Sequence, residues 1–246
     1  ALCWCLPLFF SGDKLSVSKG FVVSVLDVGQ GLSILIKTRQ HALLYDAGGR
    51  YKSWDAGRDI IAPYLLRFGI NRIDKLIISH GDMDHRGGAS YLYHNFFIKT
   101  VLSSEPERLT VPSVHCFEGQ SWCWDGVCFK VLSPSLDSDW RGNRRSCVVL
   151  IDDGVRKVLL AGDIDIIVEK WLINKYPIKV EGLVVPHHGS LTASSGVFLD
   201  NLKPSWAVIS AGRNNKFHLP NKAVVERYLV RGIKVFNTQV HGDITK

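Results

Sequence analysis

The sequence predicts a mixed α/β protein, and three observations lead to this class. Short runs of apolar and β-branched residues, each of strand length and mostly bounded by Gly, Pro, Asp or Ser, recur along the chain. The early runs follow one another closely, whereas segments with helical spacing separate later ones. The length of 246 residues, with 46% apolar and 22% charged residues, is typical of one globular domain with a sizeable core.

The elements can be placed in chain order. Helices are expected at 59–68, 89–95, 164–175 and 221–231, the last with Pro220 just before it as a start signal. Asp125-Gly126 and Asp153-Gly154 predict two hairpin turns, because such pairs favour tight turns between strands. The expected strands are 21–26, 33–36, 42–45, 75–78, 148–151, 157–160, 183–185 and 206–209.

The first ten residues, ALCWCLPLFF, are apolar but make up only half of the roughly 20 residues that cross a bilayer. They lack the basic start and the small-residue cleavage site of a signal peptide. We therefore expect residues 1–20 to be the end of a preceding membrane or linker segment and residues 21–246 to form the domain. A simple buried strand is the alternative for this start.

The formal charge of +7 and the isoelectric point of 9.1 favour a polyanionic partner. The excess charge is spread out, with small basic clusters at 141–145 and 213–216. These clusters weakly favour nucleic acid, although a solvated face would look much the same.

None of the six cysteines forms a CxxC pair, so a structural zinc knuckle is not expected. Four of them lie in one stretch, where one or two disulfides could form in an oxidising compartment, and buried thiols are the alternative. These four are Cys116, Cys123, Cys128 and Cys147.

Polar side chains follow four of the expected strands. Asp46, His80, Asp163 and the pair His187-His188 each come at or just after a strand end. In layered α/β folds, ligands gather at strand ends, because the sheet is rigid and the loops beyond it carry polar groups. We expect one site if these ends share an edge.

The segment HGDMDH, from His80 to His85, places four potential metal ligands within six residues. Imidazole nitrogen and carboxylate oxygen both bind divalent ions, and such a density after an apolar strand is hard to explain as a surface charge run. Asp163 closes an otherwise apolar strand, where a carboxylate is costly unless it is exposed, paired or coordinated. The pattern therefore indicates a metal centre.

Taken together, HxDxDHxGG, the later Gly-Asp and Pro-His-His-Gly-Ser resemble the metallo-β-lactamase superfamily, whose usual cluster reads HxHxDH. Further motifs, DVGQG at 27–31, FGINRID at 68–74 and the segment 206–210, resemble the metallo-β-lactamase-like domain of the ComEC family of DNA-uptake channel proteins. The resemblance covers the chain from about Phe21 onward. It implies a four-layered αβ/βα sandwich.

The resemblance also implies the site residues. Asp163 takes the bridging-carboxylate position, and Asp84, His188 and His218 are the implied catalytic residues. No histidine lies upstream of the Gly-Asp strand where the superfamily has its third metal motif; Asn143 and Ser146 are the polar residues there. With Asp46 they complete the possible polar site residues. The implied metal ligands are His80, Asp82, Asp84, His85, Asp163, His187 and His188.

Asp82 stands where the superfamily usually has a second histidine. A carboxylate in place of an imidazole makes the site harder and more anionic, which favours Mn²⁺ or Mg²⁺ over Zn²⁺. We expect one or two divalent ions, with Mn²⁺ preferred and Zn²⁺ or Mg²⁺ as alternatives.

The function that the resemblance implies is a metal-dependent nuclease that degrades the non-imported DNA strand during natural transformation. Its implied partners are single-stranded DNA, the membrane channel domain of the same polypeptide and the DNA-uptake machinery. Its implied place is the periplasmic face of the inner membrane. The alternatives are an inactive DNA-binding or gating module and a hydrolase of another substrate, such as a phosphorylcholine ester or, least in keeping with the charge, a lactam.

Overall fold

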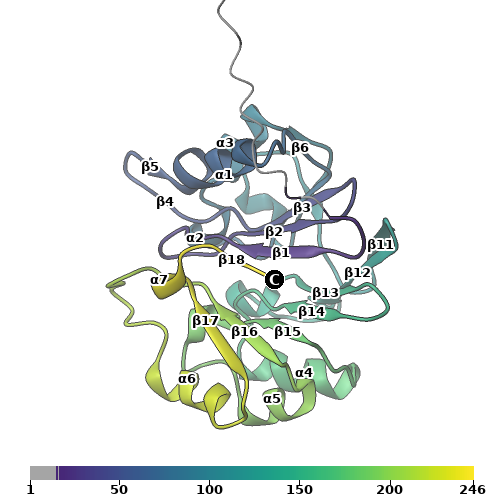
Figure 1. Cartoon of the computed structure of the whole chain (residues 1–246), viewed down its shortest axis with the longest axis vertical. Helices are drawn as coiled ribbons and strands as arrows, with labels where there is room; N and C mark the ends of the chain where they lie inside the picture. Colours follow the sequence, from purple (N-terminus) through teal and green to yellow (C-terminus); the bar gives the residue numbers. More distant parts are fainter. Residues whose placement is uncertain (1–14, 16) are drawn as a thin grey trace, which may run out of the picture.

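The computed structural model of the protein describes residue 15 and residues 17–246, so most of the expected preceding segment 1–20 lies outside the described residues. Figure 1 shows a four-layer sandwich, in which α1 and α3 cover one sheet and α4, α5 and α6 cover the other. Each sheet has seven strands. The mixed α/β class and the four-layered sandwich are both confirmed.

The first sheet has the strand order β10-β9-β7-β3-β2-β1-β18. The strands β1, β2 and β3, which come first in the chain, form an antiparallel meander. The strands β3, β7, β9 and β10 then pair in parallel. All four residues of β3 are buried, which explains its uninterrupted apolar run. The strands are β1 (Val22–Val25), β2 (Ile34–Lys37), β3 (Ala42–Tyr45), β7 (Lys75–Ile78), β9 (Val101–Ser103), β10 (Val114–His115) and β18 (Ile244–Thr245).

The second sheet runs β11-β12-β13-β14-β15-β16-β17. Strands β11 to β14 are antiparallel, and the β11–β12 and β13–β14 turns fall at the two predicted hairpins. Strands β14 to β17 are parallel, with helices between them. The strands are β11 (Ser121–Trp124), β12 (Val127–Ser133), β13 (Val148–Asp152), β14 (Lys157–Leu160), β15 (Gly182–Val184), β16 (Trp206–Ile209) and β17 (Lys234–Asn237).

The helices match the predicted positions with shifted ends. The predicted helix 59–68 is divided into a π-helical turn, Gly57–Ile61, and α1 (Ala62–Arg67), which has Pro63 in its first turn, where its missing N–H costs nothing. The predicted helix 164–175 begins at Ile166, because Asp165 caps it by accepting from the N–H groups of Ile167 and Val168.

The remaining elements were predicted only in part. The helix after Pro220 is α6 (Lys222–Leu229), with Asn221 as its cap. The sequence pattern did not predict α5 (Gly196–Leu202) or β9. The other elements are α2 (Met83–Arg86), α3 (Ala89–Asn95), α4 (Ile166–Lys175), α7 (Thr238–His241), β4 (Arg50–Tyr51), β5 (Trp54–Asp55), β6 (Arg72–Ile73), β8 (Phe97–Ile98) and the short 3₁₀ turns Pro106–Arg108, Gly142–Arg145 and Pro186–Gly189.

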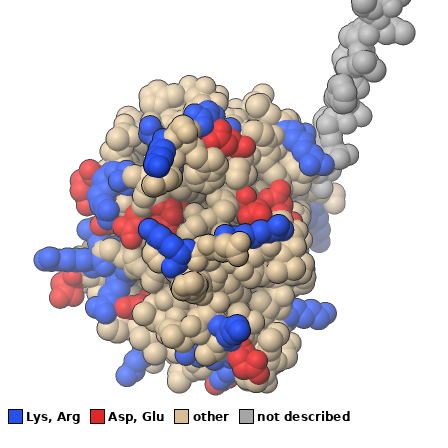
Figure 2. Space-filling view, turned by 90° about the vertical axis from the view of Figure 1, so that its left-hand side faces the viewer, with Lys and Arg blue, Asp and Glu red and all other residues tan. Residues whose placement is uncertain are grey.

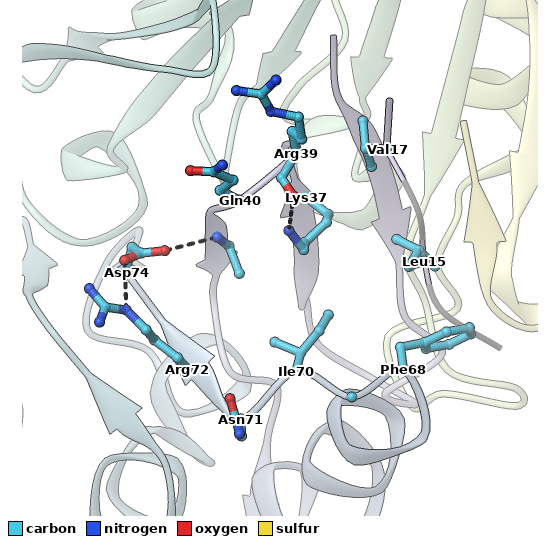
Figure 3. Close-up of a pocket in the computed structure, with 12 residues that line it drawn as sticks. Leu15, Val17, Lys37, Arg39, Gln40, Phe68, Ile70, Asn71, Arg72 and Asp74 are labelled. Atoms are coloured by element: carbon cyan, nitrogen blue, oxygen red, sulfur yellow. Dashed lines mark hydrogen bonds and ion pairs between the residues drawn. The ribbon is translucent and has the colours of Figure 1, made fainter. Parts of the chain in front are cut away.

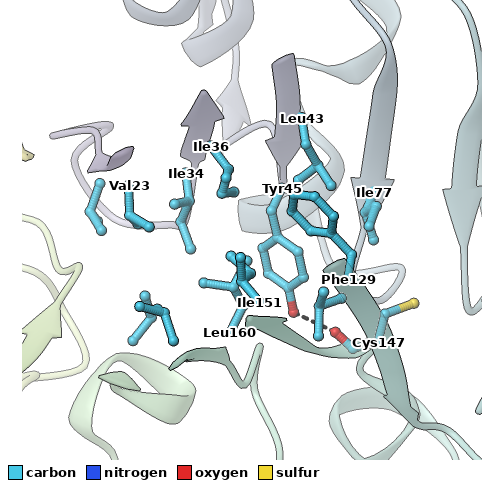
Figure 4. Close-up of a cluster of buried hydrophobic side chains, with 14 of the residues drawn as sticks. Val23, Ile34, Ile36, Leu43, Tyr45, Ile77, Phe129, Cys147, Ile151 and Leu160 are labelled. Carbon is cyan, nitrogen blue, oxygen red and sulfur yellow. Dashed lines mark hydrogen bonds between the residues drawn. The ribbon is translucent and has the colours of Figure 1, made fainter. Parts of the chain in front are cut away.

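The core between the two sheets is built from side chains of both, as Figure 4 shows. Tyr45 of the first sheet is fully buried there, and its hydroxyl donates a hydrogen bond to the carbonyl of Cys147 at 2.7 Å. Two further apolar clusters fill the space between each sheet and its own helices. The sheets are thus held face to face, which fixes the loops at their edges relative to one another.

The four cysteines from 116 to 147 form two disulfides in the structure, Cys116–Cys147 and Cys123–Cys128. The second links neighbouring strands across the β11–β12 hairpin. Of the two alternatives that the sequence leaves open for these residues, the structure has the disulfides.

Within the described part of the chain, no helix is long and apolar enough to cross a membrane.

Candidate metal centre

Loops from both sheets meet at one edge of the sandwich and carry the predicted site residues. Asp46 follows β3 and His80 follows β7 in the first sheet. Asp163 comes shortly after β14 and His188 after β15 in the second sheet. Each of these four side chains is buried. The strand ends that the sequence predicted to share a site therefore do lie together.

The side chains form two overlapping groups of potential metal ligands. His80, His85 and Asp163 offer one set, and Asp84, His85 and His188 offer the other, with the ligand atoms of each set within 4.8 Å of one another. His85 is common to both. Its Nε2 lies 3.3 Å from Oδ2 of Asp163 and 3.9 Å from Oδ2 of Asp84. Because His85 offers a single Nε2 lone pair, it can bind one ion, in either of the two groups.

Each of the three buried histidines is oriented through its Nδ1 atom. His85 Nδ1 donates to Asp46 Oδ2 at 2.8 Å, and His188 Nδ1 donates to the Ser210 carbonyl at 2.8 Å. His80 Nδ1 lies 3.0 Å from the Ser79 hydroxyl, which donates its own hydrogen to Asp46. With Nδ1 protonated on all three rings, the Nε2 lone pairs are left to bind a metal.

The geometry of these rings fits a cation. Nε2 of His85 and Nε2 of His188 lie 3.3 Å apart, and two lone pairs at that distance repel each other unless a positive charge lies beside them. The buried atoms His80 Nε2 and Asp163 Oδ1 have no hydrogen-bond partner, which costs free energy in a protein interior. A divalent ion bound by His80, His85 and Asp163 would satisfy the unpartnered atoms and place a positive charge beside His188, so the residues present fit a metal.

The charges within the cluster also favour binding of a cation. Burial lowers the pKa of His85, but the carboxylates of Asp163 and Asp46 outweigh it and raise this pKa well above its usual value. Burial would raise the pKa of Asp163, yet His85 and His188 hold this pKa well below the usual range. The Asp163 carboxylate thus stays ionised and draws positive charge to the rings, as a proton or as a metal ion.

Comparisons with known proteins agree with this centre. Residues 26–213 match the family model described as the metallo-beta-lactamase superfamily. The chain belongs to this superfamily. The solved structure of the metallo-beta-lactamase fold protein YhfI from Bacillus subtilis has the same fold, with a TM-score of 0.61 at 12% identity over 92% of this chain and all of that one.

The relatives in sequence include a competence protein and a recombination protein, which confirms the predicted resemblance. The chain is 39% identical over 222 residues to competence protein ComA of Neisseria gonorrhoeae, covering 89% of this chain and 31% of ComA. It is 37% identical over 253 residues to recombination protein 2 of Haemophilus influenzae, covering 99% and 30% respectively. The chain therefore spans about a third of the length of these relatives.

Asn143 and Ser146, two other predicted residues, form hydrogen bonds to residues of the metallo-β-lactamase-type centre. The Ser146 hydroxyl accepts from the backbone N–H of Asp163 at 3.0 Å and donates to the Asn143 carbonyl at 2.7 Å. The Asn143 amide lies 3.2 Å from His187 Nε2, whose ring also contacts the Thr192 hydroxyl through Nδ1. His187 is thus held by neighbouring polar groups, with its Nε2 still 3.8 Å from Asp163 Oδ2.

The structure places Asp82 at the rim of the centre. Its Oδ2 lies 3.6 Å from His80 Nε2, while its Oδ1 forms an ion pair with Arg108 at 3.2 Å. The side chain is 44% exposed and belongs to neither of the two ligand groups found among the described residues. Its role as a ligand stays a prediction.

His218 lies outside the cluster. It is exposed on the loop between β16 and α6. In the part of the chain that the structure describes, no hydrogen bond or ion pair joins its ring to the predicted ligands. Its catalytic role therefore stays a prediction too.

The backbone of the centre is held in unusual conformations. Asp46, His187 and His188 have φ values of 60°, 51° and 54°, a left-handed region that costs a non-glycine residue roughly 1 kcal/mol. The paired glycines after His85 pack tightly: a Cβ on Gly88 would lie 2.4 Å from the backbone nitrogen of Gly57. Without side chains, these glycines let the chain between α2 and α3 lie close to its neighbours.

Sequence reasoning missed three groups that position the ligands. They are the Ser79 hydroxyl, the Ser210 carbonyl and Glu105, whose Oε2 accepts from the N–H of Gly81 at 2.7 Å. Glu105 carries a sequence signal, because it comes two residues after β9, as His80 comes two residues after β7. Only the fold reveals the carbonyl, since every residue has one.

A cavity of about 550 Å³ opens beside Asp84, between the β4–β5 hairpin and the loop after β16. On the face seen in Figure 2, acidic side chains gather near the middle height of the molecule with lysine and arginine side chains around them.

Another cavity, of about 490 Å³, includes Lys37, Arg39 and Arg72 among its lining residues (Figure 3). Lys37 donates to the Thr38 carbonyl, and Arg72 pairs with Asp74. None of the residues that line this cavity belongs to the ligand groups of the metal centre.

Proposed function

We propose that this domain is a metal-dependent nuclease that hydrolyses DNA phosphodiesters during DNA uptake. The observation that carries the proposal is the pair of facing Nε2 atoms of His85 and His188, flanked by the carboxylates of Asp84 and Asp163. The names of the relatives, competence protein ComA and recombination protein 2, support DNA as the substrate. The net charge of +7 supports a polyanionic substrate.

The proposed ion is Mn²⁺, bound by His80, His85 and Asp163 with Asp84 and His188 beside them. When bound, such an ion polarises a phosphodiester oxygen and makes a neighbouring water more acidic. The harder carboxylate donors Asp84 and Asp163, with Asp82 at the rim, support manganese or magnesium rather than zinc. A second ion is proposed only beside Asp84 and His188, since His85 already binds the first.

The protein's own groups then orient the reactants. The Asp84 carboxylate is partly exposed and borders the cavity, so it can accept a hydrogen bond from the attacking water or take its proton. His188 is fixed by the Ser210 carbonyl and lies 3.5 Å from Asp84, where its ring, when Nε2 also carries a proton, can stabilise negative charge on the phosphate. We propose His218, next to the cavity residue Phe217, as a proton donor to the leaving oxygen.

In the whole polypeptide, we propose that this domain is attached to a membrane channel domain and lies on the outer face of the inner membrane. Its substrate there would be the strand that is not imported. The two disulfides support an oxidising compartment, in which such bonds persist. The chain covers only about a third of the length of its relatives, so the rest of such a polypeptide could contain the channel domain.

A DNA-binding or gating module is the second candidate, and the contacts of His187 favour it. The Asn143 amide lies 3.2 Å from Nε2 of His187, the atom that would otherwise bind an ion. The domain would then keep its charge and its cluster without cleaving DNA.

Cleavage of end-labelled single- and double-stranded DNA tests the proposal. The purified protein would be incubated with Mn²⁺, Mg²⁺, Zn²⁺ or EDTA, beside Asp84→Asn and, as a matched control, Asp200→Asn, whose carboxylate is exposed and pairs with Arg231. We expect Mn²⁺-dependent cleavage that Asp200→Asn keeps and Asp84→Asn loses.

The nuclease proposal fails if no divalent ion supports cleavage, and equal cleavage by Asp84→Asn would trace the activity to a contaminant. Tight DNA binding without cleavage would favour the gating module.

A further inference from the structure

The cavity beside Asp84 has the composition of a binding site for unpaired nucleobases. We propose that it stacks one or two bases of single-stranded DNA next to the phosphate that is cleaved; this inference rests on the proposed DNA substrate. We call it the aromatic groove, and its lining residues are Gln30, Gly49, Arg50, Tyr51, Trp54, Met83, Asp84, Asn215, Lys216 and Phe217.

One wall of the groove is the β4–β5 hairpin, which projects from the first sheet (Figure 1). Tyr51 and Trp54 are direct cross-strand partners in this hairpin, so their side chains lie on the same face. Tyr51 is 69% exposed, and Trp54 is half-buried against the core under α1. The wall therefore presents two aromatic rings, one anchored and one open to solvent.

The opposite wall is the loop after β16, in which the Asn215 side chain forms several hydrogen bonds to the backbone. Asn215 donates to the carbonyls of Gly212 and Leu219 and accepts from the N–H groups of Phe217 and Leu219. Phe217 is 56% exposed, and the Lys216 ammonium lies 4.9 Å from the centre of its ring. A third aromatic ring is thus fixed opposite the hairpin with a cation beside it.

The floor of the groove leads to the metal centre. Met83 and Asp84, from the start of α2, line it, and Gly49 lies between this floor and the hairpin. A Cβ on Gly49 would lie 3.6 Å from the Trp54 ring and 3.7 Å from Cα of Asp84. A base resting on Trp54 would consequently be a close neighbour of the carboxylate that borders the reacting phosphate.

The charges of the groove select nucleic acid over an apolar peptide. Arg50 and Lys216 line it, and Lys52 lies 5.3 Å from the Tyr51 ring centre. Among the described residues, Asp84 at the metal end is the single acidic side chain that lines it. Rings that stack bases and cations that contact phosphates are the combination found in single-strand binding sites. Duplex DNA hides the faces of its bases, so the groove favours a single strand.

Binding to the metal-free protein tests the groove without requiring cleavage. The full chain, treated with EDTA, would be titrated into a labelled single strand and into an abasic strand of equal length and charge. We expect the base-bearing strand to bind roughly tenfold tighter or more. Tyr51→Ala/Phe217→Ala should abolish this preference. Phe97→Ala should keep it, because Phe97 is 59% exposed on β8 and lies outside the groove.

A further variant separates stacking from simple apolar contact. Phe217→Leu keeps an apolar side chain without a π face, so it should lose part of the preference for bases. Equal binding of the two strands by the wild type, or an unchanged preference in Tyr51→Ala/Phe217→Ala or in Phe217→Leu, overturns the inference. A wild type that prefers bases but never cleaves DNA would instead refute the nuclease proposal and leave the groove standing.

Discussion

Asp46 accepts a hydrogen bond from Nδ1 of His85 at 2.8 Å, although the two residues lie 39 positions apart. Both side chains are fully buried. The same carboxylate accepts from the N–H and the hydroxyl of Ser79, whose oxygen in turn lies against His80. One acid outside the ligand groups therefore sets the orientation of two histidines in the candidate metal centre.

Asp46→Asn should weaken metal binding by about 10- to 100-fold, since groups that orient metal-binding histidines typically contribute this much. Isothermal titration with Mn²⁺ measures the change. Asp74→Asn is the matched control, because Asp74 is also buried and hydrogen-bonded, but to Arg72 and the N–H of Ala42 away from the centre. Equal loss of affinity in both variants would assign the effect to general destabilisation.

Added Mn²⁺ should stabilise the fold, because an ion that binds only the native state shifts the unfolding equilibrium. At a free concentration of 100 times Kd the gain is about 2.7 kcal/mol, or roughly 5 to 10 °C in Tm for a chain of this size. Thermal unfolding followed by circular dichroism measures it. Asp163→Asn should lose the shift and Asp200→Asn should keep it; an undiminished shift in Asp163→Asn would place the ion elsewhere.

Asp82→His should move the ion preference toward zinc by on the order of tenfold, because an imidazole replaces a hard carboxylate. Metal analysis after dialysis against equal Mn²⁺ and Zn²⁺ gives the ratio. Arg108→Gln, which removes the ion-pair partner of Asp82 but leaves its carboxylate, should keep the wild-type preference. An unchanged ratio in Asp82→His would show that Asp82 does not bind the ion.

Asp125 should make the fold sensitive to acid. It joins the β11–β12 turn to the β2–β3 turn by accepting from the Gln40 N–H and the Thr38 hydroxyl, both at 2.8 Å. Burial would raise the pKa of Asp125, but these bonds and His41 lower it to about 2. A carboxyl with a depressed native pKa stabilises the fold above its ordinary pKa of 3.8 and loses this contribution as the pH falls toward 2.

Asp125→Asn should therefore cost on the order of 1 to 2 kcal/mol at pH 7, and less at pH 2.5. Urea unfolding at several pH values between 2 and 7 measures the difference. Asp137→Asn, at an exposed loop position, should follow the wild type throughout. A deficit in Asp125→Asn that stays constant from pH 7 to pH 2.5 would contradict the argument.

Local pattern predicted most of the fold. The runs around Val23, Leu44 and Leu159 are strands, and the two Asp-Gly pairs are hairpin turns, because both depend on near neighbours in the chain. The boundaries of the π turn and α1 and the existence of α5 were not predicted. These depend on packing against residues far away in the sequence, such as Gly88 against Gly57.

The sequence by itself determined the chemistry of the site: apolar strands followed by His80, Asp163 and His188 bring candidate ligands to a rigid edge, and Asp46 follows another strand there. The tertiary structure alone decided how those ligands are used. Packing the two sheets brings Nε2 of His188 to His85 across 103 positions, turns Asp82 partly toward Arg108 and leaves His218 exposed. The aromatic groove depends equally on the fold, since the hairpin of Tyr51 and the loop of Phe217 meet only after both sheets have packed, and neither segment alone can bury or position a ring.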